Sequence, residues 1–230
     1  MVFKAPLISG RLIKRYKRFL ADVQLDNGEI ITAHCTNSGT MKSCLEANAR
    51  VMLSPVDDPN RKTRFTWEMI EINQNWVGIN TSNPNQLAFE AISQNKIPEL
   101  SNYDSVKREV KFGDSRFDIM AENSSEICFV EVKNVTLKEG NYALFPDAVT
   151  TRGTKHLNTL MEAKRTGHRA VMLYIVQRQD VEIFAPAKDI DPNYTKTLIE
   201  AYQSGVEVLA YQAIVTEQDI TIGKKLPFEY

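Results

Sequence analysis

Three charged residues lie within stretches of the chain that are otherwise apolar. Glu131 and Lys133 interrupt the apolar run at 127–135, and Asp118 lies on the preceding predicted strand. Charged side chains inside a buried strand are strongly unfavourable unless they are paired or bind a metal ion. Because side chains alternate along a strand, Glu131 and Lys133 share one face. We expect Asp118 to reach that face if its strand pairs with the next one.

The chemistry that this set of residues supports is phosphodiester hydrolysis. The two carboxylates and the backbone carbonyl of Val132 form a site for one hard divalent ion, Mg²⁺ or Mn²⁺. Lys133 would orient and help to deprotonate a metal-bound water. We expect Glu109, one strand earlier, to share the metal or position the lysine. Glu90 on the first predicted helix is a candidate for the same two roles. The alternative is a buried ion network of Asp, Glu and Lys with no catalytic role.

A second polar set opens the helix predicted at 151–165. Arg152, Lys155 and His156 lie within one turn of each other near the N-terminus of this helix. Cationic side chains there would hold a phosphate, and the helix N-terminus adds its own partial positive charge. We predict these three residues as nucleic-acid contacts. Ordinary helix capping and surface solvation is the alternative.

A basic run near the N-terminus is interleaved with aromatic residues. On a strand, Lys14, Tyr16 and Arg18 would share one face, and Arg15 and Lys17 would share the other. Tyrosine among cations suits a nucleic-acid backbone and base stacking, so we predict these five residues as nucleic-acid contacts. An edge strand protected by charge is the alternative.

Residues 1–81 are expected to form one small closed barrel. Asp26-Asn27-Gly28 is a hairpin signal, because glycine adopts the positive φ that such turns demand. Five strands in so short a span, with a long first strand, fit an OB-like barrel. The predicted strands are Arg11–Leu25, Glu29–Cys35, Arg50–Val56, Arg64–Ile72 and Trp76–Asn80.

Residues 82–230 are expected to form an α/β domain with a mixed central sheet. Helices are predicted at 83–95, 151–165 and 191–203 from their capping residues and apolar spacing. The unbroken apolar run at 170–176 predicts a strand that is buried on both faces. The predicted strands are Val106–Lys111, Arg116–Met120, Ile127–Val135, Ala170–Val176, Val181–Ala185 and, last, Glu207–Ala213.

The composition excludes several classes of protein. With 43% hydrophobic and 25% charged residues over 230 positions, the chain is of the globular type. No run of apolar residues is long enough for a membrane span, and basic residues interrupt any signal-peptide pattern, so we expect a cytoplasmic protein. Three cysteines without a CxxC pair argue against disulfides and structural zinc. His34 and Cys35 are neighbours on a strand and point apart, which argues against a nucleophilic cysteine.

The charge is unevenly distributed along the chain. Residues 1–81 carry 11 basic and 8 acidic side chains, whereas residues 82–230 carry 17 basic and 21 acidic ones. This asymmetry favours an electrostatic footprint at the N-terminal end. A solvated strand face near a terminus explains the same counts.

The order of the predicted elements carries a resemblance. An α-β-β-β-α-β core with Asp118 on its second strand and Glu131-x-Lys133 on its third resembles the PD-(D/E)xK nuclease fold. Phe117 stands where that motif often has proline. The chain as a whole closely resembles the sugar fermentation stimulation protein A family. The strings that carry this second resemblance are KRYKRFLADV, HCTNSGTM, RFTWE, NTSNPN, EVKFGDSRFD, FVEVKNVTL, FPDAVTTRGTKHL and KDIDP.

This family resemblance implies a fold and a partner. It implies an OB-like domain followed by a PD-(D/E)xK nuclease-like domain, and a cytoplasmic protein that binds DNA without sequence preference. It also implies a link to maltose metabolism. By motif, Asp118, Glu131 and Lys133 correspond to the metal and lysine positions of the nucleases. Thr36 departs from the proline that often follows His-Cys in the family, which concerns only the rigidity of that loop.

Two hypotheses of function follow from these patterns. The first is a Mg²⁺- or Mn²⁺-dependent nuclease that acts on DNA. The second is a non-catalytic DNA-binding regulator of genes for sugar metabolism. Two acids near a phosphate path repel DNA, which favours the nuclease. No membrane partner is expected, and the sequence leaves open the form of the nucleic acid, the role of the His34–Met41 loop and the oligomeric state, with a homodimer among the options.

Overall fold

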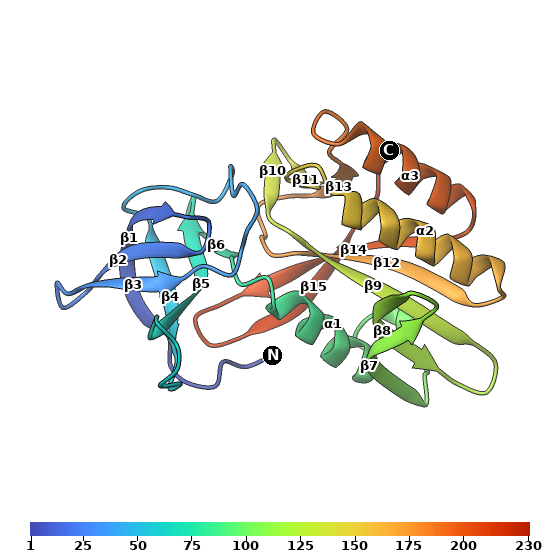
Figure 1. The fold of residues 1–230 in the computed structure, drawn as a ribbon, viewed down its shortest axis with the longest axis horizontal. Helices are drawn as coiled ribbons and strands as arrows, with labels where there is room; N and C mark the ends of the chain where they lie inside the picture. The colour runs from blue at the N-terminus through green and yellow to red at the C-terminus, as the bar shows by residue number, and fades with distance from the viewer.

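The first six strands form one curled sheet, seen at the left of Figure 1 in the computed structural model, which describes all 230 residues. The strand order is β3-β2-β1-β4-β5-β6, and a pairing between β3 and β5 closes the first five strands into a barrel. This is the OB-like architecture that the sequence predicts. The strands are β1 (Ile8–Tyr16), β2 (Leu20–Leu25), β3 (Ile30–His34), β4 (Arg50–Pro55), β5 (Phe65–Ile72) and β6 (Asn75–Gly78).

The long first strand of the prediction is wrong. The stretch 11–25 is a hairpin that turns at Lys17 and Arg18, whose φ angles are 51° and 64°. Left-handed residues at both positions match the twist of the flanking strands, but neither residue is Gly, Asn or Asp, so the sequence held no turn signal. Strand alternation therefore ends at Tyr16, and Arg18 does not share its face. The strand predicted at 76–80 is β6, which pairs with β5 outside the closed barrel.

The barrel encloses its own apolar core. The inward-facing positions are fully or almost fully buried, as alternation along a half-buried strand requires. Trp67 fills much of the interior, and its indole N–H donates to the Met69 carbonyl over 2.9 Å. Gly10 lies where β1 crosses β2, and a Cβ there would come within 2.6 Å of Val23 Cγ1. The other large buried side chains include Leu12, Val51, Leu53, Ile70 and Val77.

The second half of the chain forms a six-stranded mixed sheet. Its order is β15-β14-β12-β9-β8-β7, in which β9, β12 and β14 run parallel and the other neighbours are antiparallel. The expected mixed sheet is therefore present. The strands are β7 (Ser105–Phe112), β8 (Ser115–Glu122), β9 (Ile127–Val135), β12 (Arg169–Val176), β14 (Glu207–Val215) and β15 (Ile220–Leu226).

Helices cover both faces of this sheet (Figure 1). Helix α1 (Asn83–Ser93) packs against one face, and α2 (Thr151–Arg165) and α3 (Pro192–Gln203) pack against the other. The alternate residues of β12 divide between the two cores, with Leu173 on the α1 side and Met172 on the α2 side. Every residue from Ala170 to Val176 is buried, which confirms the prediction of a doubly covered strand.

Several elements were not predicted. Strands β10 (Leu137–Glu139) and β11 (Tyr142–Phe145) are among them, as is a short 3₁₀ turn, η1 (Pro98–Leu100), after α1. The strand predicted at Val181–Ala185 is present as β13 (Ile183–Pro186), but it pairs with β11 in a small sheet beside the main one. Strand β14 is not the last, because β15 folds back on it. The first residues of the chain lie on this second half, where the Ile220 N–H donates to the Met1 carbonyl over 2.9 Å. No helix is both long and apolar enough to cross a membrane.

Candidate metal centre and nucleic-acid interface

Asp118 lies where strands β8 and β9 separate. The ladder between these strands begins at Ile119 and Val130, and beyond it the Asp118 carboxylate accepts the backbone N–H of Val132 over 2.8 Å. Its other oxygen accepts from the Asn85 side chain over 2.7 Å. Burial and the Glu131 charge raise the pKa of Asp118 above its usual value, and these two hydrogen bonds only partly oppose the rise.

Glu131 is the most buried member of the site. Its side chain is 3% exposed, and one carboxylate oxygen contacts both Lys133 Nζ and His156 Nδ1. Burial alone would raise the pKa of Glu131, but the hydrogen bond from His156 and the Lys133 charge outweigh burial and hold the pKa below its usual value. Glu131 and Lys133 therefore share a face, as alternation predicts.

His156 reaches this site from helix α2. Its Nδ1 lies 3.2 Å from Lys133 Nζ, and Arg152 Nε donates to its Nε2 over 3.3 Å. With Nε2 as the acceptor, Nδ1 carries the proton and donates to Glu131. The helix is fixed at this end because the Thr150 hydroxyl caps it by accepting from the Gly153 N–H over 3.0 Å.

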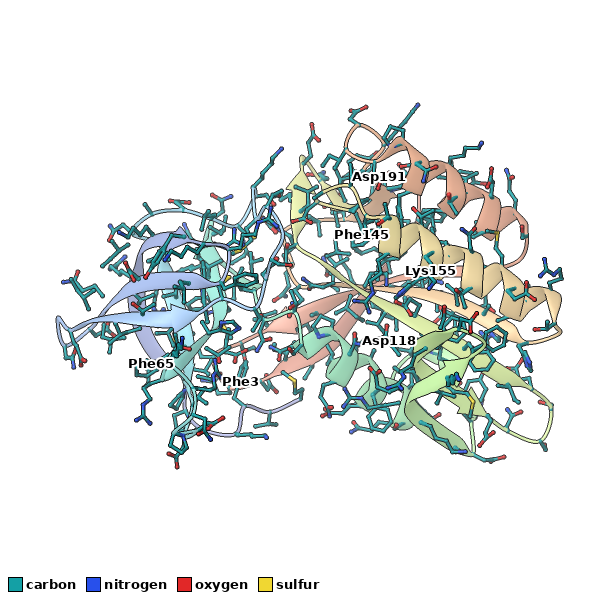
Figure 2. The ribbon with its side chains drawn as sticks, in the orientation of Figure 1. Phe3, Phe65, Asp118, Phe145, Lys155 and Asp191 are labelled. Atoms are coloured by element: carbon teal, nitrogen blue, oxygen red, sulfur yellow. The ribbon has the colours of Figure 1, made fainter.

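The structure thus gives His156 a different place from the one predicted. The sequence indicated a phosphate contact at the helix start, but the imidazole packs against Glu131 and Lys133. Arg152 and Lys155 are exposed, as a phosphate contact requires (Figure 2 labels Lys155 on α2 and Asp118 on the neighbouring strands). The spacing of Arg152 and His156 by four residues indicated a shared helix face, but nothing local indicated which strand that face covers.

Asn85 is a site residue that the sequence analysis missed. It lies in the first turn of α1, and its side chain donates to Asp118. The string NTSNPN marked the helix start, and an amide side chain there has no distinctive chemistry of its own. Only the packing of α1 beside β8 brings the two residues together.

Two acids named in the sequence analysis lie apart from this set. Glu109 is on β7 with a φ of 54°, and its 54% exposed carboxylate lies 3.8 Å from Arg116. Glu90 pairs with the N-terminal ammonium of Met1 over 3.0 Å. No hydrogen bond or ion pair joins either acid to Asp118, Glu131 or Lys133. The left-handed backbone turns Glu109 outward, so the expectation that it shares the metal or positions the lysine has no support in this geometry.

The basic N-terminal run is also used differently from the prediction. The Arg15 guanidinium donates to three backbone carbonyls, those of Arg18, Asn37 and Gly39, at 2.7–3.2 Å. The N–H groups of Arg15 therefore stabilise the turn and the loop after β3, and they are not available to bind phosphate.

Tyr16 and Lys14 are likewise engaged. The Tyr16 hydroxyl donates to Asp22 over 3.0 Å, and Lys14 Nζ lies 5.4 Å from the tyrosine ring centre and 3.7 Å from Asp22. Lys17 and Arg18 are exposed in the turn. Of the five residues predicted as nucleic-acid contacts in this run, Lys17 and Arg18 are the two exposed cations whose side chains form no ion pair.

The loop after β3 joins the barrel to the second half of the chain. The Thr40 N–H donates to Asp147 over 2.8 Å, and a Cβ on Gly39 would come within 2.2 Å of the same carboxylate. The buried Arg178 guanidinium donates to the Ser43 carbonyl and hydroxyl at 3.2 and 3.1 Å. The His34–Met41 loop therefore has a structural role at the junction, next to the segment that leads into α2.

Comparisons with known proteins cover both halves. Residues 13–79 match the family model described as the SfsA N-terminal OB domain, and residues 82–219 match the one described as the sugar fermentation stimulation protein RE domain. A sugar fermentation stimulation protein homolog from Geotalea uraniireducens is 51% identical over 227 residues, covering 98% of each chain. One from Pelobacter propionicus is 52% identical over 223 residues, covering 96% of this chain and 97% of its own. SfsA of Pyrococcus furiosus in complex with Ca²⁺ is 29% identical with a TM-score of 0.90, covering 100% of this chain and 98% of that one.

Proposed function

This chain belongs to the sugar fermentation stimulation protein family, and we propose that it binds DNA without sequence preference and hydrolyses phosphodiester bonds with Mg²⁺ or Mn²⁺. The observation that carries the proposal is a pair of carboxylates at the point where β8 and β9 separate, with Lys133 against one of them. The proposal assigns binding mainly to residues 1–81 and chemistry to a PD-(D/E)xK-like domain at 82–230.

The donors at this point fit a hard divalent cation. Two carboxylates and the Val132 carbonyl are oxygen ligands of the kind that Mg²⁺ and Mn²⁺ prefer. No group of three or more His, Cys, Asp or Glu side chains is arranged to hold a metal ion, so the carbonyl and water would have to complete the coordination. The pKa of Asp118 is raised by burial and by the Glu131 charge, a repulsion that a bound cation would relieve.

The chain's own residues have separate roles in this proposal. Asp118 and Glu131 would hold the ion, which would supply a polarised water and a positive charge beside the scissile phosphate. Lys133 orients the attacking water. His156 holds Glu131 and Lys133 together, and Arg152, outside it, is placed to bind a phosphate. Asn85 fixes the Asp118 carboxylate.

The comparisons support the proposal in two respects. The matched C-terminal model carries the description RE domain, and the relative from Pyrococcus furiosus was solved in complex with Ca²⁺. Calcium takes oxygen ligands of the same type as magnesium. A divalent ion at an oxygen-donor site is therefore consistent with this family.

One observation favours the alternative of a non-catalytic DNA-binding regulator of sugar metabolism genes. Glu131 is already neutralised, because Lys133 and His156 both contact one of its oxygens. Such a network satisfies a buried charge without a metal ion. If it is only structural, metal should not bind and removing Lys133 should affect folding alone.

The experiment that separates the two is a cleavage assay. Purified protein would be incubated with plasmid, single-stranded DNA and RNA, with Mg²⁺, Mn²⁺ or EDTA. The nuclease proposal predicts metal-dependent products that are lost in Asp118→Asn. Binding without cleavage in any metal would favour the regulator.

A further inference from the structure

A polar groove lies on the barrel where it faces the second half of the chain. Its volume is about 630 Å³, and it lies between the end of β3, the β4–β5 loop and the segment that joins β6 to α1. Arg61, Lys62 and His34 line it together with Asn80 and four hydroxyl side chains. No carboxylate lines the groove, so its chemistry suits an anion.

Neighbouring cavities show that this lining is not general. A cavity of the same volume beside the N-terminus is lined by two acids, Glu68 and Glu90, as well as two basic side chains. One of about 500 Å³ beside β10 is lined by two acids, Glu139 and Asp189, as well as three lysines. Carboxylates in these cavities would repel phosphate. The groove is the large cavity of the barrel that would accept a polyanion.

The rim of the groove adds charge and an aromatic surface. The exposed turn of Lys17 and Arg18 leads through Phe19 into Leu20, which lines the groove. Phe19 is 51% exposed and offers an open ring face. Aromatic faces beside cations bind unstacked bases, because every base has a π-face.

The floor of the groove leads to the carboxylate site. The buried Glu68 carboxylate accepts from the Asn80 and Asn83 amides at 2.9 and 3.1 Å, which fixes this segment. Two residues later, Asn85 donates to Asp118. The six residues from Asn80 to Asn85 span at most about 20 Å. A strand held in the groove therefore lies within reach of Asp118.

We propose that the substrate is single-stranded nucleic acid, which the groove holds and delivers to the Asp118–Glu131 site. This inference rests on the proposed function. A volume of about 630 Å³ is in the range of small-ligand sites, about 300–1,000 Å³, so the groove accommodates a nucleotide unit. The exposed Phe19 ring can stack on a base only when that base is unstacked from its neighbours, which favours a single strand over a duplex. A duplex lying outside the groove would also face the acidic second half, which carries 17 basic and 21 acidic residues.

Binding is tested by fluorescence anisotropy in Ca²⁺. The probes are labelled single-stranded DNA of about 12 nucleotides, RNA of the same sequence, and the blunt DNA duplex of that sequence. This length is within the range of OB-fold binding sites. We expect both single strands, or the preferred one, to bind at least tenfold more tightly than the duplex. Arg61→Ala/Lys62→Ala should flatten the log–log salt slope for single strands by about 1.4, which is two phosphates at about 0.7 each.

The controls separate folding from binding. Lys196→Ala removes an exposed charge on α3 and should leave the affinity for single strands unchanged. Arg61 donates to Thr66 over 3.2 Å, so Lys62→Ala alone is used if the double variant does not fold. Lys62→Ala alone should flatten the salt slope for single strands by about 0.7. Duplex binding as tight as single-strand binding, or a wild-type slope in the groove variant, would overturn the inference.

Cleavage distinguishes this inference from the proposed function. The same three nucleic acids are incubated with wild-type protein in Mg²⁺ and Mn²⁺. Cleavage of single strands in preference to duplex supports both. Equal cleavage of duplex and single strand overturns the inference and leaves the proposed nuclease intact. If none of the three nucleic acids is cleaved, the nuclease proposal is overturned, and so is the proposal that the groove delivers a substrate to Asp118.

Discussion

The Lys133→Ala variant separates a catalytic lysine from a structural one. Lys133 contacts a Glu131 side chain that is only 3% exposed. Removing one partner of a buried ion pair destabilises a protein by about 3–5 kcal/mol. His156 also contacts Glu131, so we expect a loss at the lower end, about 3 kcal/mol. In a chain of this size that lowers Tm by roughly 6–12 °C.

The second variant, Lys133→Ala/Glu131→Gln, removes the charge that the first leaves unpaired. It should regain most of the lost Tm, because a neutral amide in the same place needs no cation. Both variants should lack metal-dependent cleavage, with a fall of at least about 10²-fold, the lower end for a group that acts on a reacting proton. Single-stranded DNA binding should persist in both, since the groove cations are intact.

The assay combines thermal melts with cleavage rates at a temperature well below both Tm values. This assignment of Lys133 is refuted if the folded Lys133→Ala protein cleaves at the wild-type rate. It is also refuted if the double variant is less stable than the single one, because Glu131 would then not be the charge that Lys133 neutralises.

Three further predictions concern the neighbours of this pair. His156→Ala should lower the cleavage rate at saturating substrate while single-strand affinity stays within about twofold, because His156 packs on Glu131 and Lys133 and not on phosphate; the reverse pattern in kcat and Kd would contradict this. Arg15→Ala should lower Tm and leave the salt slope of binding unchanged, because its donors hold backbone carbonyls and hydrogen bonds to charged groups contribute about 1.5–3 kcal/mol each; a flatter slope at an unchanged Tm would restore its predicted phosphate role. Asp118→Asn loses one of the two hydrogen bonds that the carboxylate accepts, but its Tm relative to the wild type should rise as the pH increases from about 4 to 7, because a carboxyl whose folded pKa is raised above its unfolded value is destabilising once ionised; a Tm difference that is constant with pH would show that ionisation of Asp118 does not affect stability.

The fold was predictable where local patterns dictate burial. Alternating strands and the Asp26-Asn27-Gly28 turn indicated the barrel, and the apolar run at 170–176 indicated the central strand of the mixed sheet. The turn at Lys17 and Arg18 has two left-handed residues but no glycine. The sequence therefore showed no sign of a turn, and a single long strand was predicted across it. Strands β10, β11 and β15 are short or polar, so tertiary pairing defines them, whereas β13 was predicted from its apolar residues.

The grouping of charged residues at the candidate site was predictable, because a buried strand cannot hold such charges alone. Glu131 and Lys133 were conspicuous against an apolar run, and Asp118 followed from strand order. The contacts of His156 and Asn85 depend on which helix covers which end of the sheet, information that is not local in sequence. The same reason explains Glu109: strand order placed it beside Asp118, but a left-handed backbone turns its carboxylate outward.

Divalent-ion binding by Asp118 and Glu131 is the step on which the proposed hydrolysis depends. The most direct measurement is cleavage of end-labelled single-stranded DNA across a Mg²⁺ and Mn²⁺ titration, with wild type, Asp118→Asn and Glu131→Gln purified in parallel. We expect products that rise with metal for the wild type and fall to the EDTA background for both variants. Products that persist in both folded variants, or none from the wild type at any metal concentration, would contradict it.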